Sequence, residues 1–253
     1  MPASIQPIVL VGGSSRRFGR DKLREPLGGG WLVDRPIAAL REVFGGHVRL
    51  VGACHPEVAR RGDGVIPDSH PGTGPVGGIV SALEACTAAA HARTIRAPGT
   101  NAGPGADTAA LLGPDIFVLA GDMPGCTTEL VRLVLHGAEA DGPARAAFAI
   151  LAQAEHPGAG LHPGAGLHPG AGLHPGAGLH PCVGIYRAGA LGVLRARLAA
   201  GLRSLHDAFV PPRLQTVPCP AGLLRNANTP EDLRADPLEA SRPPAPRRTP
   251  PLP

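Results

Sequence analysis

Aromatic residues are scarce in this chain and make up 3% of its 253 residues. The core must therefore be built from aliphatic side chains and alanine, which a hydrophobic content of 43% allows. No stretch approaches the ~18 consecutive apolar residues of a membrane-spanning helix. The N-terminal segment also lacks a basic region followed by a long apolar run. We therefore expect neither a membrane span nor a secretion signal.

Cysteine pairs with metal-site or redox spacing are missing as well. The chain has five cysteines, an odd number, and no CxxC motif. They are widely spaced, at Cys54, Cys86, Cys126, Cys182 and Cys219. This pattern argues against a disulfide framework or a zinc site and favours a reducing compartment. We expect a cytoplasmic protein.

The charge is mildly positive, with a formal net value of +4 and a pI near 9.1. There is no dense run of Lys and Arg with interleaved aromatic residues, so no nucleic-acid partner is expected. A positive balance suits an anionic small-molecule substrate, but ordinary surface charge is the favoured explanation.

Glycine and proline are abundant, at 36 and 30 residues, and they gather in three stretches. Residues 91–113 read as a flexible surface loop rich in Ala, Gly, Thr and Pro. Residues 156–179 are four copies of HPGAGL, which predict a flexible insertion, although the evenly spaced histidines could also hold a transition metal. Residues 236–253 form a Pro/Arg-rich tail, expected to be disordered or to bind a proline-recognition module. The remainder, within 1–235, reads as one domain.

Short apolar strands alternate with amphipathic helices through this domain. Strands are predicted at 7–11, 47–53, 64–67, 116–120, 146–151 and 183–186, and helices at 32–44, 77–90, 128–135 and 191–198. The alternation predicts a three-layer αβα, Rossmann-like domain with a mostly parallel sheet.

The first chemically informative run is LVGGSSRRFGRDK, residues 10–22. A strand leads into Gly12-Gly13, where the absence of Cβ lets backbone N–H groups approach phosphate oxygens. Arg16, Arg17 and Lys22 add positive charge where a triphosphate would lie. The spacing fits neither GxxxxGK[ST] nor GxGxxG, so this is not a P-loop or a dinucleotide fingerprint.

This run resembles the LAGGxSxRMGxDK signature of the nucleotidyltransferases that act on the molybdenum cofactor. Four further motifs of that family follow in the same order. They are VIPD at 65–68, GPVGGI at 74–79, AGDMP at 120–124 and RNANTPEDL at 225–233. The resemblance spans 7–233 apart from the two inserted stretches. It implies the three-layer fold and transfer of GMP from GTP to the cofactor phosphate, with Mg²⁺ and release of pyrophosphate.

The resemblance assigns roles to individual residues. Lys22 and Arg17 would stabilise charge on the reacting phosphates, and Asp122 would bind Mg²⁺, a hard cation that prefers oxygen ligands. The remaining GTP contacts would be Leu10, Val11, Gly12, Gly13, Asp68, Gly74, Gly77 and Gly78. On the acceptor side would lie His180, Asn226 and Asn228. Transient contact with proteins that deliver or receive the cofactor is also implied.

Several alternatives stay open. An Asp after a strand can simply be a turn residue, and Asn228-Thr-Pro can simply cap the helix that begins near Pro230. His180 is singled out only by its place next to a predicted strand, because every repeat carries the same His-Pro. Ala53 stands where the guanylyltransferases often have a nucleotide-contacting Asn. Cytidylyl transfer, an acceptor other than this cofactor, and a homologue that binds nucleotide without catalysis are the competing functions.

Overall fold

The computed structural model describes residues 5–13, 18–96, 113–139, 147–155 and 178–234. Most of the two predicted insertions, 91–113 and 156–179, lies outside these residues, as does the predicted tail, 236–253. Arg16 and Arg17 lie outside them too. The expectations for these segments therefore stay predictions.

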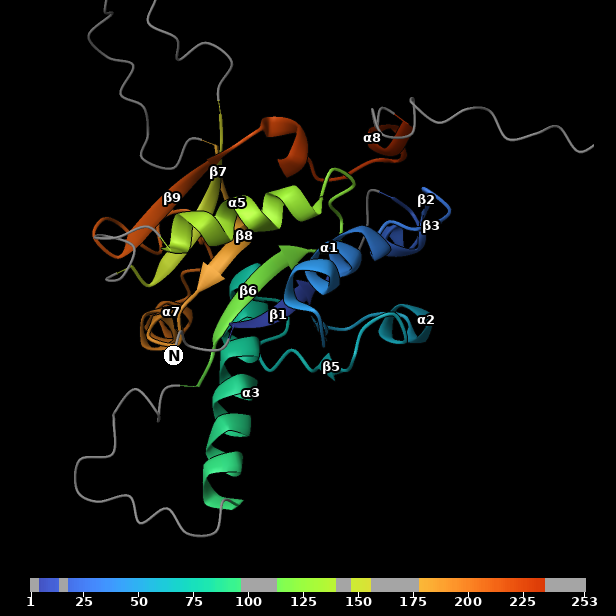
Figure 1. Cartoon of the computed structure of the whole chain (residues 1–253). Helices are drawn as coiled ribbons and strands as arrows, with labels where there is room; N and C mark the ends of the chain where they lie inside the picture. The colour runs from blue at the N-terminus through green and yellow to red at the C-terminus, as the bar shows by residue number, and fades with distance from the viewer. Residues whose placement is uncertain (1–4, 14–17, 97–112, 140–146, 156–177, 235–253) are drawn as a thin grey trace, which may run out of the picture.

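A seven-stranded sheet forms the centre of the domain, in the order β5-β4-β1-β6-β8-β7-β9 (Figure 1). Its strands are β1 Ile5–Leu10, β4 Arg49–Val51, β5 Val65–Ile66, β6 Asp115–Ala120, β7 Ala149–Ala154, β8 Leu179–Tyr186 and β9 Leu214–Cys219. Strand β8 is antiparallel to both of its neighbours, and every other pairing is parallel. The predicted mostly parallel α/β sheet is confirmed.

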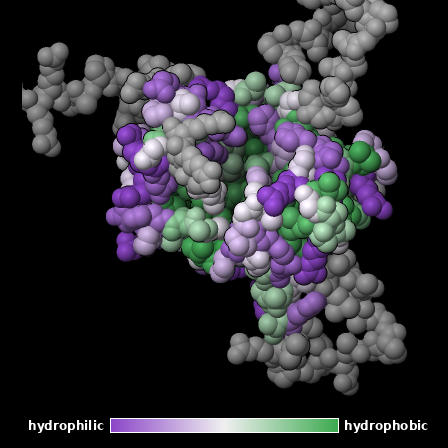
Figure 2. All heavy atoms as spheres, turned by 180° about the vertical axis from the view of Figure 1, so that it is seen from behind, coloured by the Kyte–Doolittle hydropathy of each residue, from purple (hydrophilic) through white to green (hydrophobic). Residues whose placement is uncertain are grey.

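Helices cover both faces of the sheet and make the three layers (Figure 1). Helices α1 (Asp34–Phe44) and α5 (Thr128–Glu139) pack on one face, and α3 (Pro75–Arg96) and α7 (Ala190–Ala199) on the other. Strand β1 shows why, because successive side chains alternate between faces. Val9 packs in the cluster that holds the buried residues of α1 and α5, whereas Ile8 packs in that of α3 and α7. Hydrophilic and hydrophobic residues are interspersed on the face in Figure 2.

A small β-hairpin follows the glycine-rich run. Its strands are β2 (Pro26–Leu27) and β3 (Gly30–Trp31), and Gly28 and Gly29 have φ angles of 61° and 86°. Two consecutive positive φ angles are those of a type I′ turn, which glycine adopts without strain. The sequence did not reveal this hairpin, because each strand has two residues.

The hairpin docks the C-terminal motif onto the glycine-rich run. Leu27 and Leu32 form a small buried cluster with Phe18, Ala227 and Leu233. Leu233 belongs to the short helix α8 (Pro230–Arg234), which is preceded by the 3-10 turn η2 (Ala221–Leu224). This cluster brings two motifs from opposite ends of the domain side by side.

Helix α3 and strands β8 and β9 differ from the sequence prediction in ways that tertiary contacts explain. Helix α3 runs to Arg96, so the predicted loop 91–113 begins as helix. Strand β8 begins at Leu179, the last residue of the predicted insertion, because it pairs with β7 from there on. Strand β9 was missed because it is half exposed and contains Pro218. None of the helices in the described part of the chain is long and apolar enough to cross a bilayer.

Candidate active site

The site lies where the strand order of the sheet reverses. After β1 the chain passes through α1 to β4 on one side, whereas β6 pairs with the other side of β1. The carboxyl ends of β1 and β6 are in register, Leu10 beside Ala120, and the Gly121 N–H donates to the Leu10 carbonyl at 2.9 Å. Ligands of open α/β sheets bind at such a switch point. The glycine turn after β1 and Asp122 after β6 therefore share one edge.

The glycine turn is supported from one side and open on the other. The Val11 N–H donates to the Val51 carbonyl at 2.9 Å, which carries the turn past the end of β4. A Cβ on Gly52, where φ is +111°, would lie 2.7 Å from the Gly12 nitrogen. Gly12 and Gly13 are exposed, and apart from its neighbours in the chain no described residue lies within 4 Å of the place where a Cβ of Gly13 would stand. Gly52 is a site residue that sequence reasoning missed.

Lys22 and Asp122 form an ion pair at this edge. The Asp21 carboxylate accepts from the Leu23 N–H at 3.1 Å and so caps the 3-10 turn η1 (Lys22–Arg24). This turn directs the Lys22 Nζ to Asp122 Oδ2, and the ammonium also donates to the Ala227 carbonyl at 3.4 Å. The two side chains are 19% and 17% exposed, so both are covered but reachable. The structure brings together the two residues that were predicted to carry the chemistry.

The C-terminal motif closes the site through its backbone. The Ala227 N–H donates to the Asp122 carbonyl at 2.8 Å, and Ala227 is buried. Its neighbours Asn226 and Asn228 are exposed. Because the buried residue between them is held inward, both asparagines lie at the surface beside the ion pair.

Helix α8 begins at Pro230, and the cap at its start comes from Asp232. The Asp232 carboxylate accepts from the N–H groups of Asn228 and Thr229, each at 2.8 Å. These hydrogen bonds lower the pKa of Asp232, because they favour its charged form. The capping group is therefore the Asp232 side chain rather than the Asn228 side chain.

A β-bulge in β8 places Cys182 near Asp122. Leu151 of β7 pairs with Gly184, but the next residue, Ala152, pairs with His180, so the residues between them bulge out of the ladder. Burial raises the pKa of the Cys182 thiol to about 12, and the Asp122 carboxylate adds to this. Cys182 is therefore a neutral thiol at neutral pH and no nucleophile. Sequence reasoning missed it, since a bulge has no clear local signal.

His180 stands at the start of the same strand. Burial lowers the pKa of His180, and the charge of His206 lowers it further. His206 belongs to the segment after α7, on the side of the sheet covered by α3 and α7. Both effects favour the uncharged His180 ring, and the neighbouring charge that acts on it is that of His206 rather than the Lys22–Asp122 pair.

The loop after β5 lies at the same edge of the sheet, beyond the end of β4. Asp68 Oδ1 accepts from the His70 N–H at 2.9 Å. Gly74 is exposed with φ +76°, whereas Gly77 and Gly78 are buried in the first turn of α3. A Cβ on Gly77 would lie 2.7 Å from the His70 carbonyl oxygen, and one on Gly78 would lie 3.2 Å from Leu10 Cδ2. The absence of a side chain at Gly77 and Gly78 is therefore required by packing against other residues of the protein.

The donor set suits a hard divalent cation that is shared with a substrate. Among the described residues there is no group of three or more His, Cys, Asp or Glu side chains arranged to hold a metal. Mg²⁺ is usually held by one or two carboxylates together with substrate phosphates, so the single carboxylate of Asp122 fits it.

An open α/β sheet with a glycine turn, a lysine and an aspartate at its switch point defines a nucleotide-binding transferase. The profile of the MobA-like NTP transferase domain matches residues 7–214, and the chain belongs to this family. A probable molybdenum cofactor guanylyltransferase of Chloroflexus aggregans is 29% identical over 240 residues, which are 90% of this chain and 90% of that protein.

Two further relatives show how far the likeness extends. A probable molybdenum cofactor guanylyltransferase of Opitutus terrae is 40% identical over 81 residues, which are 32% of this chain and 40% of that protein. The structure of molybdopterin-guanine dinucleotide biosynthesis protein A from Archaeoglobus fulgidus has a TM-score of 0.55. It is 22% identical, with 94% of this chain and 99% of that chain covered, and it demonstrates a shared fold.

Proposed function

We propose that this transferase moves GMP from GTP to the phosphate of the molybdenum cofactor and releases pyrophosphate. The observation that carries the proposal is the Lys22–Asp122 pair beside the exposed Gly12-Gly13 turn. The names of the relatives from Chloroflexus and Opitutus support the choice of both substrates.

The reaction is a substitution at phosphorus. An oxygen of the cofactor phosphate forms a bond to the α-phosphorus of GTP, and the bond from that phosphorus to the bridging oxygen breaks, so pyrophosphate leaves with the electron pair. The attacking phosphate is already ionised near neutral pH, so no general base is needed. Catalysis then rests on alignment and on neutralising charge.

The residues of the site meet both needs. The glycine turn offers backbone N–H groups to the phosphates, and the Lys22 ammonium stabilises charge on the α-phosphate or the leaving group. Asp122 would hold Mg²⁺, which when bound would neutralise the triphosphate charge. Asn226 and Asn228, exposed beside the pair, would face the cofactor.

Nucleotide choice is the finer part of the proposal. The Gly12-Gly13 pair and the GPVGGI segment favour guanine by resemblance to the guanylyltransferases. Ala53, where those proteins often have Asn, is exposed after β4 and offers no polar side chain to the nucleotide. The five free cysteines suit a reducing compartment, and we place the reaction in the cytoplasm.

Pyrophosphate release by the purified protein tests this function. The assay contains Mg²⁺ and molybdenum cofactor and compares GTP, CTP, ATP and UTP, with a reaction lacking cofactor as the control. Release that requires both GTP and cofactor is the expected result. Release with CTP and with no other nucleotide would mean that the enzyme transfers CMP and that the proposed preference for guanine is wrong. GTP binding without release under any condition would favour a homologue that binds nucleotide without catalysis, or a different acceptor.

A further inference from the structure

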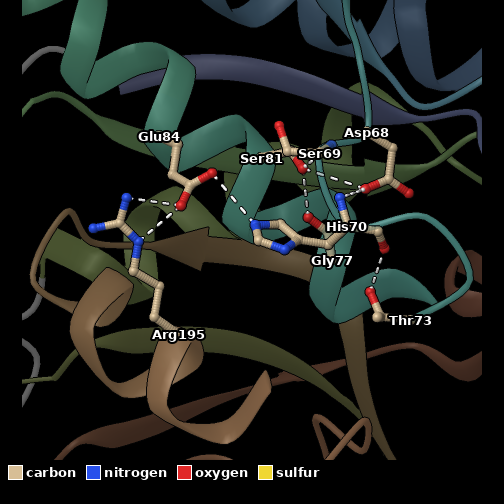
Figure 3. A network of polar contacts seen from close by, with 8 residues as sticks. All are labelled: Asp68, Ser69, His70, Thr73, Gly77, Ser81, Glu84 and Arg195. Atoms are coloured by element: carbon tan, nitrogen blue, oxygen red, sulfur yellow. Dashed lines mark hydrogen bonds and ion pairs between the residues drawn. The ribbon is translucent and has the colours of Figure 1, made fainter. Parts of the chain in front are cut away.

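Ser81 is a buried residue whose hydroxyl group contacts the loop that carries Asp68. It stands on α3, is 2% exposed, and is one of three buried polar or charged residues in the described part of the chain. Its Oγ accepts from the Ser69 N–H at 2.9 Å, and lies 2.8 Å from the Gly77 carbonyl and 3.3 Å from Asp68 Oδ1 (Figure 3). Ser81 therefore ties the β5–α3 loop to the helix that follows it.

The contacts hold Asp68 by one oxygen. A hydroxyl has a single proton, which Ser81 donates either to the Gly77 carbonyl or to Asp68 Oδ1. The His70 N–H donates to that same Oδ1 at 2.9 Å. Within the described residues no hydrogen bond reaches Asp68 Oδ2, and Figure 3 shows this oxygen directed away from the network. The carboxylate is thus fixed in place with one acceptor oxygen left for a ligand.

A second ring of contacts braces the loop from outside. His70 Nε2 lies 3.4 Å from Glu84 Oε2, and Arg195 of α7 donates from Nε to Glu84 Oε1 at 2.7 Å (Figure 3). The Thr73 hydroxyl donates to the His70 carbonyl at 2.6 Å, and Arg203 donates to the Gly72 carbonyl at 3.2 Å. Helices α3 and α7 therefore hold a loop that would otherwise have to order on binding.

We propose that Ser81 is a positioning residue for the nucleotide donor: it holds Asp68 so that Oδ2 accepts from an N–H or O–H donor of the bound nucleotide. The inference rests on the proposed function, since it takes a nucleoside triphosphate as the ligand. A carboxylate fixed before binding loses less conformational entropy when the ligand arrives. Ser81 acts through Asp68 and touches no reacting atom.

Calorimetric titration with GTP and Mg²⁺ tests the inference without the acceptor. Ser81→Ala should raise the Kd for GTP about tenfold, the effect of losing a hydrogen bond that involves a charged group. In the full reaction the KM for GTP should rise similarly, and kcat should change much less. Thr87→Val is the matched control, because the Thr87 hydroxyl makes the same bond to a helix carbonyl, Leu83, at 2.8 Å, without touching the loop. It should leave the Kd unchanged.

A double-mutant cycle separates positioning from general weakening of the fold. In an Asp68→Ala background, Ser81→Ala should have no further effect on the Kd, because the group it positions is gone. Additive effects, or a Kd unchanged by Ser81→Ala in the wild-type background, would overturn the inference. Ser81→Cys, which replaces the hydroxyl with a much weaker hydrogen-bonding group, is the second variant if Ser81→Ala unfolds, and it should raise the Kd for GTP in the same direction. Wild-type protein that binds no GTP would overturn the proposed function, and this inference with it.

Discussion

The Lys22 ammonium donates to Asp122 Oδ2 across 100 positions of sequence, and the backbone of Ala227 contacts both residues. Each side chain is less than one-fifth exposed, so each charge satisfies the other while the site remains open at its edge. A triphosphate would offer the lysine a second anionic partner, and a divalent cation would compete with it for the carboxylate. The pair is thus a preformed charge arrangement for phosphate chemistry.

Removing the lysine should strongly lower turnover and leave the fold intact. Lys22→Ala is expected to lower kcat/KM by about 100-fold or more, because a charge aimed at the reacting phosphates is lost. The measurement is pyrophosphate release, with thermal unfolding followed in parallel. Arg24→Ala is the control, since Arg24 stands in the same turn and pairs with Glu57 instead. Turnover equal to wild type in Lys22→Ala would remove this residue from the mechanism.

Lys22 can also be followed chemically, because it is the only lysine in the chain. Reductive ¹³C-methylation should give one lysine resonance in addition to that of the N-terminal amine. Titration with GTP and Mg²⁺ should shift the lysine resonance as its ammonium changes partners from Asp122 to phosphate. A resonance that stays in place while calorimetry records GTP binding would mean that the nucleotide binds away from Lys22.

The two aspartates at the ends of β6 should behave differently. Asp122→Asn is expected to lower turnover at least about 100-fold and to weaken Mg²⁺ dependence, because the only carboxylate of the ion pair is lost. Asp115, at the start of the strand, accepts from the Ala188 N–H at 3.0 Å and pairs with Arg187. Asp115→Asn should cost about 1 kcal/mol of stability and leave turnover of the folded protein unchanged. Equal losses of turnover in the two variants would contradict this assignment.

A methyl group on Gly77 should disturb the β5–α3 loop. Its carbon would lie 2.7 Å from the His70 carbonyl, so the backbone must move, at an expected cost of about 1–3 kcal/mol in the free energy of unfolding. Gly192→Ala on α7 is the opposite case, because apart from its neighbours in the helix none of the residues that the structure describes lies within 4 Å of its Cβ position. It should stabilise the protein by about 0.5–1 kcal/mol. Urea unfolding of both variants checks the prediction, and a stabilising Gly77→Ala would refute the contact.

Alkaline pH should weaken the fold partly through Cys126. This residue is 3% exposed, and burial raises the pKa of its thiol to about 12. In the unfolded chain a thiol ionises near pH ~8.5, so the folded state binds more protons between these values. The stability this thiol contributes is complete below the unfolded pKa and is lost as pH rises toward about 12.

The measurement is the urea midpoint of wild type and of Cys126→Ala at about pH 8 and at about pH 10.5. Between these two pH values most of the thiol of the unfolded chain ionises. Cys126→Ala should show a smaller change than wild type, whatever its own stability at the lower pH. Identical pH dependence in the two proteins would show that the Cys126 thiol ionises alike in both states.

The fold class could be predicted because its signals are local. The run Pro7 to Val11 is continuously apolar, as a strand covered on both faces requires, and the glycine pair marks its end. Helix and strand ends were less predictable. Helix α3 continues to Arg96, and β8 starts at Leu179, because tertiary pairing rather than composition sets those limits.

The sequence by itself determined the order of the motifs and the residue types that phosphate chemistry needs, because both are properties of short segments. The tertiary structure alone decided which of them meet. Lys22 reaches Asp122 because β1 and β6 are parallel neighbours in register. Cys182 comes near Asp122 through a bulge, and Ser81 holds Asp68 because Gly77 lets the loop cross the start of α3. These relationships depend on close packing between distant segments, which no local pattern specifies.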